Sequence, residues 1–170
     1  MVVGDSLVRD LPEKFAAFPE VQVRVHRGAY IETLIELFTT GFVESKWLGV
    51  TSVFMLIGTN HTKNTEVQYF EKKYTALLQI VRARLGDIQL IVCTVPPRSR
   101  DFKDWNWRVK DFNCAISRAA VKAKAILYPL HKAFLYDGVP RATYFCDGLH
   151  FSKLGTNVLT KAVKKFWCKK

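Results

Sequence analysis

The chain has 170 residues, of which 49% are hydrophobic and 24% are charged. This composition is typical of one globular domain that buries a core, and it excludes a disordered or coiled-coil protein. The formal net charge is +11, from 26 Lys and Arg against 15 Asp and Glu. Such an excess attracts nucleic acid or an anionic membrane, but it also occurs on ordinary soluble proteins and does not decide the function.

No apolar run approaches the roughly 20 residues that span a bilayer, and no secretory signal opens the sequence. We therefore expect an intracellular, cytoplasmic protein. A strand pattern begins at the first residues, so residues 1–170 are interpreted as one domain excised from a longer polypeptide. The four cysteines lack metal-ligand spacing, which predicts no metal site. They could form two disulfides in a secreted protein, but nothing in the sequence indicates secretion, so we expect reduced thiols. Cys146 is interpreted as a small buried packing residue.

Strand and helix patterns alternate along the whole chain. Two of the strand segments are almost wholly apolar, as strands buried on both faces are, and the helical segments carry apolar stripes. Gly41 and Gly86 are expected to end helices, and Ser152 to cap the last one. In chain order the expected elements are strands at 2–4 and 21–25, a helix at 31–38, a strand at 53–57, a helix at 67–81, a strand at 88–92, a helix at 109–123, a strand at 125–128 and a helix at 154–166.

Strands that alternate with helices imply crossover connections, and hence a mostly parallel sheet with helices on both faces. The sequence therefore predicts a three-layer α/β/α sandwich around a sheet of about five strands. We see no internal repeat, low-complexity tract or linker that would divide it.

Polar residues and a glycine follow the predicted strands at the points where these strands end. Ser6 follows the first strand, Gly28 the second and Asn60 the third. Asp147 and His150 lie in the loop before the last helix. Because the carboxyl ends of parallel strands meet at one edge of a sheet, we expect these five residues to lie close together. Each alone is more often a turn or loop residue, and only their joint order predicts a site.

These residue types suit the hydrolysis of an ester by a serine. The Ser6 hydroxyl is a weak nucleophile that needs a base, and His150 can take its proton and return it to the leaving alcohol. Asp147 can fix the tautomer of His150 and stabilise the imidazolium. Candidate donors to the oxyanion are the backbone N–H groups of Ser6 and Gly28 and the side-chain amide of Asn60. The sequence thus predicts a Ser-His-Asp triad with an oxyanion hole.

The same residues resemble the motifs of the SGNH (GDSL) hydrolase family. The resemblance covers residues 2 to about 155 and implies a flavodoxin-like sheet. It also implies ester hydrolysis through an acyl-enzyme, with no cofactor, and an oxyanion hole formed by Ser6, Gly28 and Asn60. The matching blocks are residues 4–7, which spell Gly-Asp-Ser-Leu, and residues 25–28, 58–60 and 147–150.

Small acetylhydrolases of the platelet-activating-factor type are similar to this chain in size. The positive charge, the Gly-Thr-Asn sequence of the third block and the run at residues 147–152 look most like a narrower group. This group is the esterase domain in the first open reading frame protein of some LINE retrotransposons. The resemblance implies that any oligomerisation uses segments outside this chain.

One position departs from the family pattern. The family commonly carries aspartate after the third-block asparagine, and here His61 stands in that place. Asn60 itself is intact, so the expected oxyanion role is kept. We interpret His61 as an exposed loop residue, with substrate contact as the alternative. His26 and His131 belong to no pattern that supports a role.

Two hypotheses of function remain. The first is an esterase for short-chain acyl esters such as acetyl esters, with lipid esters among the candidates, and the intact set of site residues favours it. The second is a binding module whose basic faces hold nucleic acid or an anionic membrane. Trp105 and Trp107 would suit stacking on bases, although packing at a helix start is the favoured interpretation. The basic residues are Lys161, Lys164, Lys165, Lys169 and Lys170 near the end of the chain, and Arg98, Arg100 and Lys103 after the fourth strand.

Overall fold

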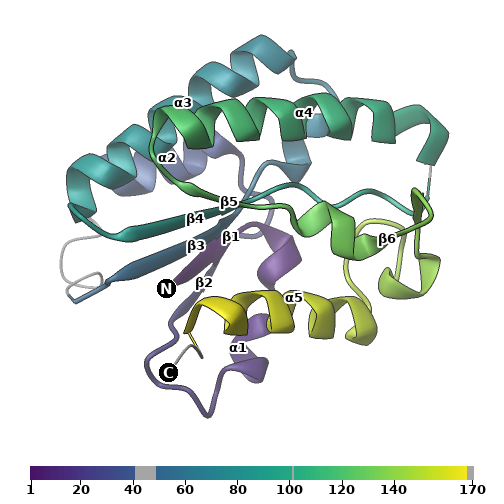
Figure 1. Cartoon of the computed structure of the whole chain (residues 1–170), viewed down its shortest axis with the longest axis horizontal. Coiled ribbons are helices and arrows are strands. Elements are labelled where there is room, and N and C mark those ends of the chain that lie inside the picture. The colour runs from purple at the N-terminus through teal and green to yellow at the C-terminus, as the bar shows by residue number, and fades with distance from the viewer. Residues whose placement is uncertain (41–48, 101, 168–170) are drawn as a thin grey trace.

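The computed structural model describes residues 1–40, 49–100 and 102–167, with the backbone alone described for residues 102–105. A central parallel sheet lies between two layers of helices (Figure 1). This confirms the predicted α/β/α sandwich. The expected helix end at Gly41 and the basic tail at Lys169 and Lys170 lie outside the described residues.

The five strands of the sheet run parallel in the order β2-β1-β3-β4-β5. This is the order of flavodoxin-like sheets, in which the connection direction reverses beside β1. Each strand lies within two residues of its predicted bounds. The strands are β1 (Val2–Gly4), β2 (Val23–Val25), β3 (Ser52–Leu56), β4 (Gln89–Cys93) and β5 (Ile126–Tyr128).

Helices cover both faces of the sheet, with α2, α3 and α4 on one side and α1 and α5 on the other (Figure 1). Val53 and Met55 of β3 pack in the core under the first layer, and Phe54 and Leu56 pack in the core under the second. Burial on both faces explains why the strand is continuously apolar. The helices are α1 (Leu11–Lys14), α2 (Ile31–Thr39), α3 (Val67–Leu85), α4 (Phe102–Lys122) and α5 (Lys153–Trp167).

Two predicted helix ends are confirmed. Gly86 follows α3 with a φ of 70°, and its N–H donates to the carbonyl of Arg82. Ser152 precedes α5, where its hydroxyl oxygen accepts from the N–H of Gly155 at 3.3 Å and its carbonyl accepts from the N–H of Thr156 at 2.8 Å. These contacts satisfy N–H groups that the first turn of a helix leaves unpaired.

Several short elements at the carboxyl side of the sheet were not predicted, because they are too short to show a period. Asp137 and Gly138 both have positive φ and join β6 to β7 in an antiparallel hairpin. An Asp-Gly pair is a common hairpin turn, so this turn carries a local signal that the sequence analysis did not use. The elements are the 3₁₀ turns η1 (Ser6–Val8), η2 (Thr59–Thr62), η3 (Leu130–Phe134) and η4 (Ala142–Tyr144), and the strands β6 (Leu135–Tyr136) and β7 (Val139–Pro140).

Within the described ranges, no helix has the length and apolar character needed to cross a bilayer. The same residues contain no group of three or more His, Cys, Asp or Glu side chains that could hold a metal ion. The intracellular location and the origin in a longer polypeptide stay predictions.

Candidate active site

The position of β1 between β2 and β3 brings three of the predicted site segments together. The carbonyl of Gly4 accepts from the N–H of His26 at 2.9 Å, and the N–H of Asp5 donates to the carbonyl of Leu56 at 3.2 Å. The backbone leading into Ser6 is therefore held on one side by the end of β2 and on the other by the end of β3. The segments that carry Gly28 and Asn60 begin at these two strand ends.

A chain of hydrogen bonds links Ser6, His150 and Asp147. The Ser6 Oγ lies 3.0 Å from Nε2 of His150, and Nδ1 of His150 lies 2.6 Å from Oδ2 of Asp147. An ionised carboxylate can only accept hydrogen bonds. In the neutral imidazole of His150 the ring hydrogen is therefore assigned to Nδ1. Nε2 is then the acceptor of the Ser6 hydroxyl, which is the arrangement required of a general base.

The Asp147 carboxylate accepts from three donors. Besides the His150 ring, the backbone N–H groups of Leu149 and His150 donate to Oδ1 at 3.0 and 2.7 Å. Partial burial opposes ionisation, but these hydrogen bonds outweigh it and hold the pKa of Asp147 well below its usual range. Asp147 is therefore ionised at neutral pH and fixes both the orientation and the tautomer of His150.

The loop with Asp147 and His150 is closed at its base by a bridge between Phe145 and Phe151. The Phe151 ring stacks on that of Phe134 with centroids 4.6 Å apart, which anchors the loop in the core. Gly148 adopts a φ of 90° at the tip, where an added Cβ would collide with Cβ of Arg100. The tight turn therefore requires glycine.

Two of the three predicted oxyanion donors are unpaired. In the described part of the chain, the backbone N–H groups of Ser6 and Gly28 have no hydrogen-bond partner. Gly28 has a φ of 70° and open space around the position of a Cβ. The Asn60 amide donates one hydrogen to the carbonyl of Ala29 at 2.9 Å, and its second hydrogen remains for another acceptor. This bond also ties the Asn60 turn to the Gly28 segment.

His61 is buried, so the interpretation as an exposed loop residue was wrong. Only 2% of its surface is exposed, and its Nε2 accepts from the N–H of Ile31 at 3.0 Å. Its Nδ1–H can then donate to Oγ1 of Thr65 at 3.1 Å. Burial lowers the pKa of His61, and the nearby Glu32 carboxylate opposes this. His61 therefore makes a second link between the Asn60 turn and the Gly28 segment.

Asp5, the residue before Ser6, is buried with no exposed surface. Its Oδ1 accepts from the N–H of Leu7 at 3.0 Å and so caps the η1 turn that begins at Ser6. Its Oδ2 has no hydrogen-bond partner of standard geometry within the described ranges. Burial raises the pKa of Asp5 to about 6, although the backbone N–H groups of Leu7, Thr59 and Gly58 act against this.

Arg98 was named from the sequence as part of a basic face, but contact of the loop after β4 with the candidate site was not predicted. The Arg98 guanidinium donates to the carbonyl of Thr59 at 3.4 Å, and the N–H of Ser99 donates to the carbonyl of Gly148 at 2.9 Å. This loop thus joins the Asn60 turn to the loop with His150. The only available signal was a cluster of basic residues after a strand, which does not indicate where the guanidinium points.

Two further expectations were wrong. Cys146 is exposed and not a buried packing residue, and its Sγ lies 3.9 Å from the Arg9 guanidinium. Trp107 has 61% of its surface exposed, so it does not pack at the helix start. The side chains of Lys103 and Trp105 lie outside the described part of the structure.

The α/β/α fold and this arrangement of side chains indicate a class of hydrolases. The GDSL-like Lipase/Acylhydrolase family model matches residues 2–158, and the chain belongs to this family. No curated protein sequence matches the chain at a significant level.

Solved structures of similar fold support this assignment. A protein from Streptococcus pneumonia whose description refers to platelet activating factor has a TM-score of 0.81 and 22% identity, over 97% of this chain and 81% of the other. A GDSL-like lipase from Bacteroides thetaiotaomicron gives 0.78 and 18%, over 97% and 85% of the two chains. An acetyl xylan esterase gives 0.71 and 16%, over 99% and 98%. At these identities the likeness shows the shared fold.

The burial of Asp5 is expected to make the free energy of unfolding depend on pH. The pKa is about 6 in the folded protein and about 3.9 in an unfolded chain, so the native state holds the proton more tightly. The stability that this proton provides is present below about pH 4 and is lost as the pH rises through 6. Relative to Asp5→Asn, the wild-type protein should lose about 2 kcal/mol of stability between pH 4.5 and 7.5.

Urea unfolding of both proteins at the two pH values measures this difference. All other titrating groups are shared by the two proteins, so their effects cancel in the comparison. The outcome that would contradict the prediction is a difference in unfolding free energy between wild type and Asp5→Asn that is the same at pH 4.5 and 7.5. It would show that Asp5 has the same pKa in the folded protein as in the unfolded chain.

Proposed function

We propose that the protein is a serine esterase that hydrolyses short-chain acyl esters, with acetyl esters as the first candidates and lipid esters as a further class. The observation that carries the proposal is the hydrogen-bonded chain from Ser6 through His150 to Asp147. Its geometry fits a nucleophile, a general base and a residue that orients the base. The described residues around Ser6 supply every group that this reaction needs, so no cofactor is invoked.

In the proposed first step, the Ser6 oxygen attacks the ester carbonyl while its proton passes to Nε2 of His150. The negative charge on the carbonyl oxygen is stabilised by the N–H groups of Ser6 and Gly28 and by the free amide hydrogen of Asn60. The carbonyl then re-forms, the bond to the alcohol oxygen breaks, and His150 gives its proton to the leaving alcohol.

The second step releases the acyl group from Ser6. His150 takes a proton from water, whose oxygen attacks the acyl carbonyl, and the second tetrahedral intermediate uses the same three donors. His150 then protonates the Ser6 oxygen as the carboxylic acid leaves. Asp147 remains ionised throughout, because its hydrogen bonds hold its pKa well below its usual range.

The substrate class has support from the family and from its fold relatives. The family is described as one of lipases and acylhydrolases, and one of the fold relatives is an acetyl xylan esterase. The resemblance to the LINE esterase domain stays a prediction, and so does the expected oligomerisation through segments outside this chain.

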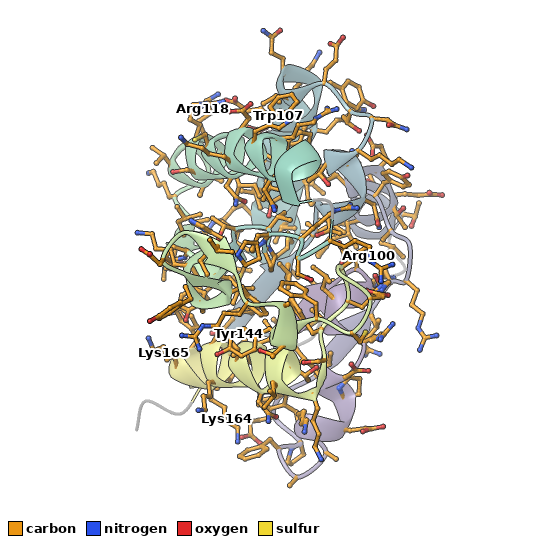
Figure 2. The ribbon with its side chains drawn as sticks, turned by 90° about the vertical axis from the view of Figure 1, so that its right-hand side faces the viewer. Arg100, Trp107, Arg118, Tyr144, Lys164 and Lys165 are labelled. Atoms are coloured by element: carbon orange, nitrogen blue, oxygen red, sulfur yellow. The ribbon has the colours of Figure 1, made fainter. Side chains whose placement is uncertain are left out.

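A second proposed role is the binding of nucleic acid or an anionic membrane through the basic surface. Lys164 and Lys165 lie on α5, and Arg118 projects from the opposite layer (Figure 2). Lys164 lies over the Phe18 ring at 4.8 Å, whereas Arg118 is bonded to the Glu71 carboxylate at 2.7 Å. The lysines of α5 are therefore the better candidates for contact with an anionic partner.

The esterase proposal is tested by hydrolysis of p-nitrophenyl acetate and of longer-chain p-nitrophenyl esters. We expect Ser6→Ala to lower kcat at least about 1,000-fold, because it removes the nucleophile and keeps the fold. Ser52→Ala is the matched control, since Ser52 lies at the end of β3 far from Asn60 and, among the described residues, its hydroxyl bonds only Gln89. Its turnover should equal that of the wild-type protein.

Turnover that depends on chain length and is lost in Ser6→Ala would also begin to define the acyl pocket. If the wild-type protein shows no turnover above Ser6→Ala for any of these esters, the esterase proposal fails. The binding of nucleic acid or an anionic membrane through the basic surface would then be the remaining proposed function.

His61 is expected to position the oxyanion donors without touching the substrate. Replacement with Leu removes the acceptor for the Ile31 N–H, so kcat should fall about tenfold or more while KM changes little. His61→Gln places an amide oxygen at similar reach and should keep most of the wild-type kcat. A fall in kcat of the same size in both variants would contradict this role, because Gln restores the acceptor and Leu does not.

A further inference from the structure

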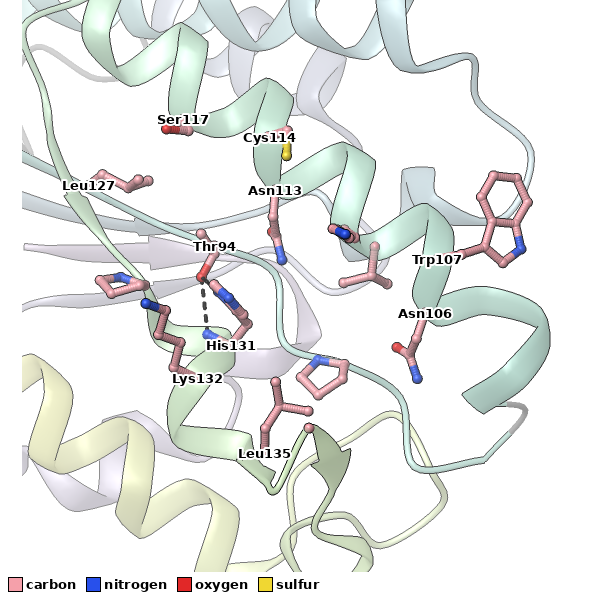
Figure 3. Close-up of a pocket in the computed structure, with 15 residues that line it drawn as sticks. Thr94, Asn106, Trp107, Asn113, Cys114, Ser117, Leu127, His131, Lys132 and Leu135 are labelled. Carbon is pink, nitrogen blue, oxygen red and sulfur yellow. Dashed lines mark hydrogen bonds between the residues drawn. The ribbon is translucent and has the colours of Figure 1, made fainter.

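A cavity of about 730 Å³ lies between α4, β5 and the segment formed by η3 and β6 (Figure 3). Small-molecule sites commonly measure about 300 to 1,000 Å³, so this cavity is large enough for a ligand. None of the candidate active-site residues lines it. These residues are Ser6, Gly28, Asn60, Asp147 and His150.

Most of the cavity wall is apolar. Val109 of α4, Leu127 of β5 and Leu135 of β6 contribute apolar side chains, and two prolines add to them. Figure 3 shows Leu127 and Leu135 across the cavity from α4. An aliphatic chain placed here would be removed from water on several sides, which favours an apolar ligand.

A hydrogen-bond donor also faces this cavity. The Thr94 Oγ1 accepts from the N–H of His131 at 3.0 Å, so its hydroxyl hydrogen is available for Nδ1 of the same histidine at 2.7 Å. The neutral ring of His131 then carries its hydrogen on Nε2, which has no partner in the described part of the chain. Burial and the neighbouring Lys132 lower the pKa of His131, which favours this neutral form.

Two exposed lysines, Lys110 of α4 and Lys132 of η3, also line the cavity. Neither forms an ion pair with any described residue. The described lining residues include no Asp or Glu. The cavity thus combines an apolar wall with positive charge that no acidic residue of the lining neutralises.

We propose that this cavity binds a single-chain amphiphilic carboxylate, with its alkyl chain along Val109, Leu127 and Leu135 and its carboxylate near Lys110, His131 and Lys132. The charge of the lysines complements the carboxylate, and Nε2–H of His131 can donate to it. The site does not depend on the proposed esterase, and Ser6→Ala should bind this ligand as well as the wild-type protein does.

Decanoate is the probe, used below the concentration at which it forms micelles, and Cys114 reports its binding. Cys114 is an exposed free thiol that lines the cavity, whereas Cys146 is an exposed free thiol outside it. Mass spectrometry of peptides would follow the alkylation of each cysteine by iodoacetamide. At ten times its Kd, decanoate should slow alkylation of Cys114 about tenfold and leave Cys146 unchanged.

Two comparisons test the chemistry of recognition. Each methylene removed from the chain should weaken binding about fourfold, so octanoate should bind more weakly than decanoate. The double variant Lys110→Gln and Lys132→Gln should raise the Kd of decanoate about three- to tenfold. Lys161→Gln is the control, because it removes a positive charge from a residue of α5 that does not line the cavity. Isothermal titration with decanoate gives a second measurement, with one site expected for each chain.

Equal protection of Cys114 and Cys146 would indicate general adsorption of a surfactant and would overturn the proposal. So would protection of Cys114 by decanol as strong as that by decanoate, because an anion site requires the charge. Loss of decanoate binding in Ser6→Ala would place the ligand at the candidate active site instead. No protection and no heat of binding would show that the cavity takes no such ligand.

Discussion

The short strand β1 is hydrogen-bonded on both sides, and the candidate active site depends on this pairing. Val2, Val3 and Gly4 are matched with residues of β2 on one edge and of β3 on the other. The backbone that leaves β1 must therefore emerge between the two neighbouring strand ends. Ser6 is therefore held between the carboxyl ends of β2 and β3. The segments with Gly28 and Asn60 lie on either side of Ser6, because they follow β2 and β3.

The contacts around this central strand support one another. Asp5 caps the turn that presents Ser6, while Asn60 and His61 tie the turn after β3 to the segment after β2. Burial of the Asp5 carboxylate is unfavourable at neutral pH, as its raised pKa indicates. This cost is consistent with a residue kept for the geometry of the turn, since an apolar side chain would be cheaper to bury but could not accept from the Leu7 N–H.

Much of this fold could be predicted because its signals are local and periodic. The apolar runs of β3 and β4 and the stripes of α3 and α5 are direct consequences of burial, and the parallel sheet follows from their alternation. The close approach of Ser6, Asp147 and His150 also followed from sequence, since the carboxyl ends of parallel strands share one edge. Their chemical roles are proposals that the geometry supports.

The remaining features depend on contacts between distant parts of the chain. His61 is buried because Ile31, thirty residues earlier, places a free helix N–H opposite its ring. Trp107 is exposed although tryptophan usually packs, and Arg98 bridges two loops that are far apart in sequence. The cavity beside β5 likewise combines residues of four elements and has no motif of its own. No window of sequence contains this information.

The central claim is that His150 activates Ser6 as a nucleophile, and a covalent label tests it most directly. In diethyl p-nitrophenyl phosphate, an activated serine oxygen attacks phosphorus and displaces p-nitrophenolate, which leaves a diethyl phosphoryl group on the protein. We predict one such group per chain, located by peptide mass spectrometry on Ser6 and absent from His150→Ala. The account would be contradicted if the wild-type protein remained unlabelled. It would also be contradicted if Ser6 were labelled equally in the wild-type protein and in His150→Ala.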